Sequence, residues 1–128
     1  MTWTILLPFA TMSLNETQGQ HWSWVRREKE KFAWSLRSAL NRQAKIPPAT
    51  GKRRVSIERT GRGRLDQDNL IGGFKWLIDA IKAERLILDD DEAHLELVAL
   101  PQIVSRKVYP STRVVIEDIE VMKVYATG

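Results

Sequence analysis

The chain has 128 residues, of which 43% are hydrophobic and 28% charged, the ordinary composition of a soluble globular protein. This length predicts one domain over residues 1–128, large enough to bury a hydrophobic core. The absence of cysteine excludes disulfides and thiolate metal sites. A net charge of +4 and a pI of about 9.6 favour an anionic partner, nucleic acid first.

The apolar run near the N-terminus, residues 3–7, is too short to span a bilayer, and no basic segment precedes it. We therefore expect neither a membrane anchor nor a signal peptide. Together with the absence of cysteine, this favours a cytoplasmic location.

Loops separate the elements predicted for the first half of the chain. In order, these are a strand over 2–7, a loop over 9–20, a helix over 22–42, a loop over 46–51, a strand over 55–58 and a basic turn over 60–64. Pro8 ends the first strand, and apolar residues at helical spacing, such as Phe32, Leu36 and Leu40, mark the helix. Apolar and polar residues alternate over 55–58, which predicts the second strand.

The second half predicts one more helix and two more strands. The helix runs from about Asp68 to Arg85 on a continuous apolar face, and the strands cover 94–98 and 113–117. The residues from Val121 either extend the last strand or lie outside the core. This order of elements predicts an α+β fold, a small mixed sheet of about four strands with two main helices packed on it.

Two acidic clusters flank the second predicted helix. Asp66 and Asp68 stand at its start, and an acidic run, residues 89–92, follows its end. Carboxylates that converge in a basic protein can hold Mg²⁺ or Mn²⁺, and such an ion assists phosphodiester hydrolysis. Acidic residues are also common as helix caps, and aspartate runs are usually solvated turns. The pattern alone leaves both interpretations open.

A basic segment leads directly to the first acidic cluster. Its cationic residues are Lys52, Arg53, Arg54, Arg59, Arg62 and Arg64. Cationic side chains bind phosphates, so the segment would bring a DNA backbone to the carboxylates. The residues predicted to contact DNA are Lys52, Arg53, Arg54, Arg62 and Arg64.

Lys75 lies between the acidic clusters, seven residues after Asp68. This separation is close to two helical turns, which places both side chains on nearly the same face at about 10 Å along the axis. Lys75 could therefore stabilise charge that develops on a bound phosphate. The alternative is an exposed lysine without a role.

Several other residues have a structural and a functional interpretation. His21 is expected to cap the first helix or to lie on the surface, with a general base as the alternative. Trp24 and Trp34 are expected to cover the sheet, with stacking on exposed bases as the alternative. Gly72 and Gly73 would each cost a helix about 1 kcal/mol relative to alanine. Close approach of another backbone segment, or a later helix start, would explain the pair.

Several segments, taken in order, resemble the RusA family of Holliday junction resolvases. They are LDQDNL at 65–70, GGFK at 72–75, IDAI at 78–81 and LDD at 88–90. The match is specific because its parts occur in order at workable spacings. Weaker similarity extends over nearly the whole chain and includes Asn15, His21 and Trp22.

The resemblance implies a homodimeric, Mg²⁺-dependent endonuclease that cuts four-way DNA junctions by paired, symmetric nicks. By motif, Asp66, Asp68 and Asp90 match the catalytic metal ligands, and Lys75 matches the catalytic lysine. The best-known pattern places the lysine four residues after the second aspartate, where this chain has Gly72. A longer-spaced variant of the family matches Lys75. Asp89 and Asp91 remain open as replacements for Asp90.

We therefore expect a small α+β nuclease that uses Mg²⁺, with Mn²⁺ as a substitute, on branched DNA during recombination and repair. Two alternatives remain open. The first is a DNA-binding protein without catalysis, in which the carboxylates only cap the helix. The second is a nuclease for flaps or other branched DNA.

Overall fold

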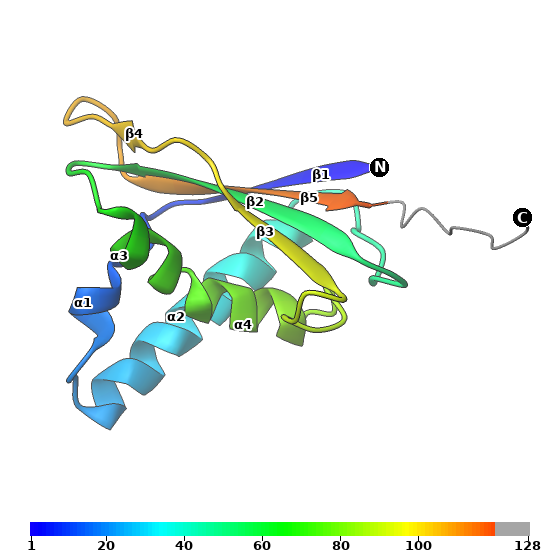
Figure 1. Ribbon diagram of the computed structural model, residues 1–128, viewed down its shortest axis with the longest axis horizontal. Helices are drawn as coiled ribbons and strands as arrows, with labels where there is room; N and C mark the ends of the chain where they lie inside the picture. The colour runs from blue at the N-terminus through cyan, green and yellow to red at the C-terminus, as the bar shows by residue number, and fades with distance from the viewer. Residues whose placement is uncertain (120–128) are drawn as a thin grey trace, which may run out of the picture.

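The computed structural model describes residues 1–119, and the structural statements below refer to these residues. Its elements, in chain order, are β1 (Thr2–Leu7), α1 (Leu14–Thr17), α2 (Trp22–Asn41), β2 (Arg53–Gly61), α3 (Gln67–Gly72), α4 (Lys75–Ala83), β3 (Leu95–Ala99), β4 (Ile103–Val104) and β5 (Ser111–Asp118). All helices lie on one face of a single mixed sheet (Figure 1). The predicted α+β fold is confirmed.

The sheet has the strand order β1-β5-β2-β3, and the short β4 also pairs with β2. β5 is antiparallel to both β1 and β2, whereas β3 and β4 run parallel to β2. The parallel pair requires the chain to cross back over the sheet between β2 and β3, and α3 and α4 make that crossover. The crossover carries most of the motif residues and therefore fixes where they lie.

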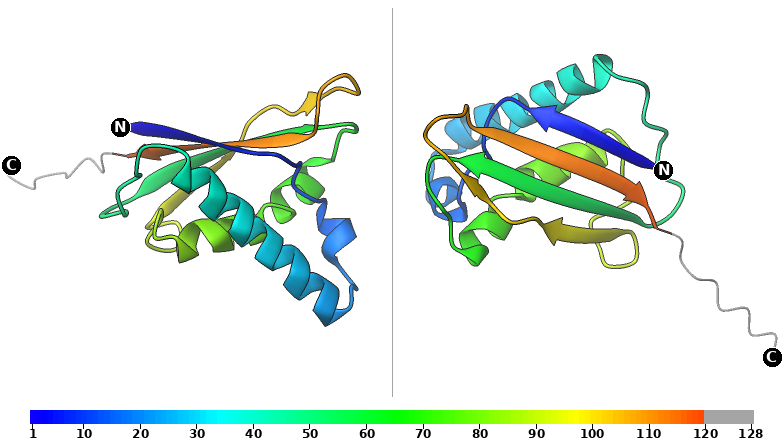
Figure 2. Two further views of the ribbon diagram at one scale, coloured as in Figure 1. Left: turned by 180° about the vertical axis from the view of Figure 1, so that it is seen from behind. Right: turned by 90° about the horizontal axis from the view of Figure 1, so that it is seen from above.

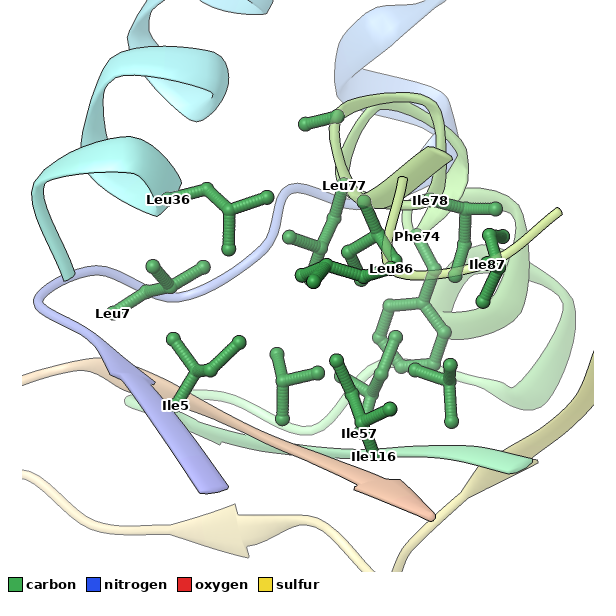
Figure 3. Packing of buried hydrophobic residues seen from close by; sticks show 14 of the residues in the cluster. Ile5, Leu7, Leu36, Ile57, Phe74, Leu77, Ile78, Leu86, Ile87 and Ile116 are labelled. Carbon is green, nitrogen blue, oxygen red and sulfur yellow. The ribbon is translucent and has the colours of Figure 1, made fainter. Parts of the chain in front are cut away.

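The core lies between the sheet and the helices (Figure 3). Alternate residues of the strands face the helices because successive side chains of a strand point to opposite faces. The fully buried members from the strands are Ile5, Leu7, Val55, Ile57, Val114 and Ile116. Phe32 and Leu36 of α2, with Phe74, Leu77 and Ile81 of the crossover, cover them. The helix-free face is shown in the right view of Figure 2.

The predicted helix from Asp68 to Arg85 is two helices in the structure. α3 ends at Gly72, and α4 begins at Lys75. Gly73 and Phe74 between them keep right-handed helical dihedral angles, and the Phe74 amide bonds to the carbonyl of Ile71, three residues back. The chain therefore tightens for one turn without reversing its direction.

The paired glycines are explained by a close approach of the loop that precedes α1. A Cβ atom on Gly73 would lie 1.8 Å from the Met12 carbonyl oxygen, and one on Gly72 would lie 2.8 Å from the Leu14 side chain. The predicted close approach of another backbone segment is thus confirmed for Gly73, whereas Gly72 meets a side chain. Residues 12–14 therefore pack directly against the end of α3.

Other differences from the predicted elements are small. α1 occupies part of the predicted loop 9–20, and β4 is an additional two-residue strand. β2 begins at Arg53, two residues before the predicted start, and this shift matters for the site. The prediction about the residues from Val121 concerns a part of the chain outside the described residues. No helix within residues 1–119 has both the length and the apolar character needed to cross a membrane.

Candidate active site

Asp66 is the N-cap of α3. Its carboxylate accepts a hydrogen bond from the Asn69 backbone amide at 2.9 Å and another from the Asn69 side-chain amide at 2.9 Å. These two bonds stabilise the charged form, and they lower the pKa of Asp66 below its ordinary value. The capping interpretation of Asp66 is therefore observed. Capping does not exclude metal binding, because each carboxylate oxygen can accept more than one partner.

Asn69 connects Asp66 to the N-terminal part of the chain. Its side-chain carbonyl oxygen accepts a hydrogen bond from the backbone amide of Asn15 at 3.0 Å. The side chain of this one residue thus holds the Asp66 carboxylate on one side and the start of α1 on the other. The predicted site residues did not include Asn69, although it belongs to the segment LDQDNL.

Asp68 begins an exposed stripe that continues into α4. Ile71, Lys75 and Asp79 follow it at steps of three, four and four residues, the spacing of one helical face. The last three residues line the same pocket, which confirms that the stripe stays in phase across the Gly73 turn. Asp68 lies one helical turn before Ile71, or about 5 Å along the axis.

A pocket of about 360 Å³ lies between the α3–α4 crossover and the segment that leads into β3. Its charged lining residues are Lys75 and Asp79 from α4, and Asp90 and Glu92 from the acidic run. The apolar floor comes from residues such as Phe74, Ile78 and Leu95. The structure therefore brings the predicted Lys75 and Asp90 together, from segments fifteen residues apart in the sequence.

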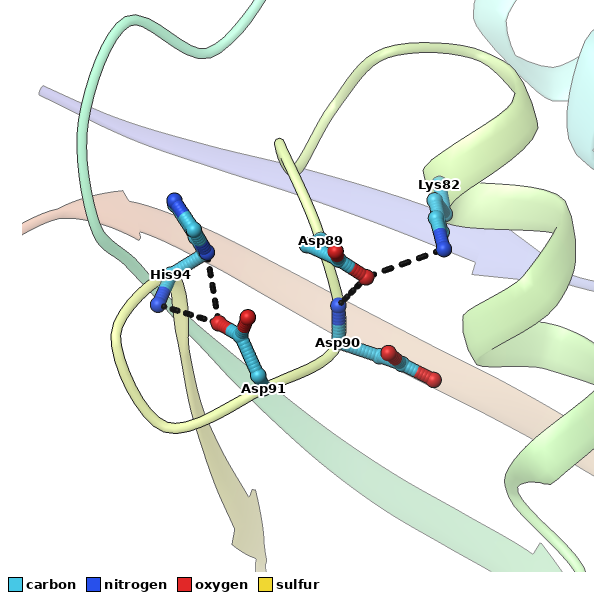
Figure 4. Close-up of polar contacts among 5 residues, drawn as sticks. All are labelled: Lys82, Asp89, Asp90, Asp91 and His94. Carbon is cyan, nitrogen blue, oxygen red and sulfur yellow. Dashed lines mark hydrogen bonds and ion pairs between the residues drawn. The ribbon is translucent and has the colours of Figure 1, made fainter.

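The three aspartates of the acidic run have different surroundings (Figure 4). Asp89 pairs with Lys82 at 2.9 Å, and this contact lowers its pKa to about 2. Asp91 is bonded to the ring and backbone amide of His94. Asp90 is exposed and its carboxylate points away from Asp91 and His94. Of the three, Asp90 is the one that lines the pocket, which favours it as the functional carboxylate.

The two acidic clusters lie at opposite ends of β2. Leu65, next to Asp66, is hydrogen-bonded through its backbone to the Gln102 side chain, near the end of β2. The acidic run instead precedes Leu95, which is paired with Arg53 at the start of β2. β2 has nine residues, a length of about 30 Å. The clusters are bridged by the α3–α4 crossover.

Asp66, Asp68 and Asp90 consequently do not form one compact carboxylate group in the described part of the chain. The residues there whose ligand atoms all lie within 4.8 Å of one another are Asp89, Asp91 and His94. Asp89 and Asp91 of that group already have protein partners, Lys82 and His94. The predicted convergence of three aspartates on one ion is thus not seen in this arrangement.

Some cations of the basic segment hold the fold together, and others are exposed and could bind phosphate. Arg53 is 2% exposed; its guanidinium bonds to Asp118 at 2.9 Å and to the Leu86 carbonyl at 2.9 Å, and it lies over the Trp3 ring. Arg53 lies on the helix-facing side of β2 because alternate residues of a strand share a face, and Val55 and Ile57 are buried there. The predicted DNA contact by Arg53 is incompatible with this burial, and we correct it to a structural role.

Arg54 lies on the helix-free face of the sheet, where its cross-strand neighbours are Glu96 and Glu117. It pairs with both, at 3.0 and 3.6 Å. Arg59 bonds to the carbonyls of Thr11 and Gly63. Burial lowers the pKa of Arg59 below its usual value. Both arginines are therefore partly used in holding the fold together.

Arg62 and Arg64 are exposed in the turn that leads to Asp66, and neither forms an ion pair within residues 1–119. Lys52 is half-buried just before β2. Of the predicted DNA contacts, Arg62 and Arg64 are the best placed, because they lie just before Asp66 and Asp68 in the chain.

Asp79 is a pocket residue that the predicted site did not contain. It lies one turn after Lys75 and shares the pocket with Asp90. The pattern IDAI, and the four-residue step from Lys75, could have indicated it. In comparisons with known proteins, no family model matches this chain, and no curated protein matches it.

Proposed function

We propose that the protein is a divalent-metal-dependent endonuclease that hydrolyses phosphodiesters in branched DNA, with the four-way junction as the preferred substrate. The observation that carries the proposal is the shared pocket of Lys75, Asp79 and Asp90, with Asp68 about two turns before Lys75 on the same stripe. A cation and carboxylates meet there on a basic protein. The resemblance to the RusA family assigns Lys75, Asp90 and Asp68 to the site, but not Asp79.

The oxygen-only donor set fits Mg²⁺ or Mn²⁺. Mg²⁺ is usually held by one or two carboxylates, several waters and a substrate phosphate, so it does not require three converging aspartates. Asp90 and Asp79 would supply carboxylates inside the pocket, and Asp68 would face the substrate backbone from about two turns before Lys75. A bound Mg²⁺ would supply a Lewis acid for the scissile phosphate.

The remaining roles belong to the chain's own cations and to the α3 cap. Lys75 would donate to a phosphate oxygen and offset the charge that develops there. Arg62 and Arg64 would hold the backbone before it reaches Asp66. Asp66, fixed by Asn69, orders the start of α3 and so sets the direction of Asp68. A homodimer would present two such sites to a two-fold junction, as paired nicks require.

A cleavage assay on an immobile four-way junction in Mg²⁺ tests the proposal. Asp90→Asn and Asp68→Asn should each lower the cleavage rate by about 100-fold or more, since each removes a carboxylate from the site, while junction affinity is retained. Asp91→Asn is the matched control, because Asp91 is engaged by His94, and it should cleave like the wild type.

Full cleavage by Asp90→Asn and Asp68→Asn, with binding intact, would favour the DNA-binding protein without catalysis. A substrate panel then separates the two nuclease classes. Junction, flap and linear duplex should be cut at clearly different rates, the junction fastest. Equal cutting of all three would remove the junction from the proposal, and a preference for flaps would replace it.

A further inference from the structure

Aromatic side chains at the β1 edge of the sheet project into solvent. Trp34 of α2 is 70% exposed, and Tyr109, in the loop before β5, is 91% exposed. The prediction that Trp34 covers the sheet is therefore wrong, whereas Trp24 packs against Trp76 with ring centroids 6.1 Å apart. Two large exposed rings on one edge of a small domain are a reason to look for a ligand there.

The two rings belong to one continuous surface. A hollow of about 300 Å³ is lined by Trp34, Pro8 and Arg42, and a neighbouring hollow of about 610 Å³ is lined by Tyr109, Pro8 and Arg42. They adjoin because Leu7, at the end of β1, pairs with Thr112 near the start of β5. Arg42 thus lines the hollow of Trp34 as well as that of Tyr109, and we call these three residues the edge platform.

The edge platform is basic. Among residues 1–119, no acidic residue lines either hollow. Arg42, together with Arg106 and Lys107 in the loop before Tyr109, makes no ion pair within residues 1–119. By contrast, Arg37 of α2 pairs with Glu84 at 3.1 Å. The cations around the exposed rings are therefore free for an anionic ligand.

We propose that the edge platform binds an unpaired stretch of nucleic acid. Bases would stack on Trp34 and Tyr109, and the backbone phosphate between them would contact Arg42. Flat rings next to a guanidinium that has no acidic partner within residues 1–119 match a ligand that has aromatic faces and a regular negative charge. A protein partner has no such regular charge. The platform lies at the β1 edge of the sheet, and the β3 edge adjoins the candidate active site, so the two are separate.

Binding of fluorescein-labelled oligonucleotides, measured by anisotropy in EDTA, tests this inference without any cleavage. The probes are oligothymidylate and oligouridylate of roughly 15 nucleotides and a duplex of the same length. The wild type should bind the single strands more tightly than the duplex. Trp34→Ala and Tyr109→Ala should each weaken single-strand binding by about fivefold or more, and binding should quench tryptophan fluorescence.

Trp22→Ala is the matched control. Trp22 lies on the same helix and is 69% exposed, but its hollow is also lined by Glu30. This variant should bind like the wild type. The two probe sugars distinguish DNA from RNA as the source of the strand, and tight binding of either supports the inference.

Three results would overturn the inference: no single-strand preference, unchanged affinity in Trp34→Ala and Tyr109→Ala, or an equal loss in Trp22→Ala. Sedimentation of the same variants tests the alternative that a second copy of the chain occupies the edge platform. If Tyr109→Ala converts a dimer to a monomer without changing oligonucleotide affinity, the surface belongs to a second copy of the chain. Circular dichroism confirms that each variant is folded.

Discussion

Asn69 is the residue that determines how Asp66 is presented. It gives the Asp66 carboxylate two hydrogen bonds, and these bonds lower the pKa of Asp66. Asn69→Ala removes the side-chain bond, so the pKa of Asp66 should rise toward its ordinary value. A pH titration of the Asp66 carboxyl carbon by NMR measures this shift. Asn41→Ala, at the exposed end of α2, should leave the pKa of Asp66 unchanged.

The sign of the associated pH dependence follows from linkage. Because the folded-state pKa of Asp66 lies below its unfolded value, ionised Asp66 stabilises the folded state at neutral pH. That contribution disappears as the pH falls through the folded-state pKa. Asp66→Asn retains a good N-cap but has no titrating group. The difference in unfolding free energy between wild type and Asp66→Asn should therefore shrink as the pH falls below 4; a constant difference would contradict this account of Asp66.

Arg53 and Arg62 should behave oppositely although both belong to the basic segment. Arg53→Gln should lower the unfolding free energy by about 2 kcal/mol, since it removes two hydrogen bonds and leaves the Leu86 carbonyl without its partner. Arg62→Gln should change stability by less than about 0.5 kcal/mol but reduce the salt slope of DNA binding by about one. Urea unfolding and a salt titration separate the two. A stable Arg53→Gln with weakened DNA binding would reverse our assignment.

At the scale of the elements, the turn between α3 and α4 depends on Gly73. A methyl group there would meet the Met12 carbonyl oxygen at 1.8 Å, and backbone cannot move away as a flexible side chain can. Gly73→Ala should therefore cost about 2 kcal/mol or more of unfolding free energy, measured by urea denaturation. Gly63→Ala, with no atom of the other described residues within 4 Å of its added Cβ, should cost little. Equal costs would contradict the packing that we describe.

Element type was predictable from the sequence because periodicity reports it directly. Strand β1 and helix α2 follow their apolar patterns almost to the residue. The start of β2 was not predicted, because arginines are not expected on a buried face. Had the alternation of Val55 and Ile57 been extended back, Arg53 would have fallen on the core side. The break at Gly73 depends on Met12, far away in the sequence, so local pattern could not place it.

At the scale of the molecule, the crossover between β2 and β3 determines which residues share the candidate active-site pocket. Sequence motifs predicted the residue types and proposed Lys75 and Asp90, which the structure brings to one pocket. They could not show that the two acidic clusters stand at opposite ends of β2, because only the parallel pairing of β2 with β3 fixes this. Asp79 enters the pocket for the same reason. Among the three neighbouring aspartates, the pocket lining and the side-chain partners of Asp89 and Asp91 distinguish Asp90.

The most direct test is the position of Mn²⁺ in crystals of the protein grown with a four-way junction, located by anomalous scattering. We predict a Mn²⁺ peak in the pocket of Lys75 and Asp90, within bonding distance of the Asp90 carboxylate, with a phosphate oxygen and the Asp68 side of the stripe facing it. A Mn²⁺ peak confined to Asp89, Asp91 and His94, with none beside Asp90, would contradict the proposed active site.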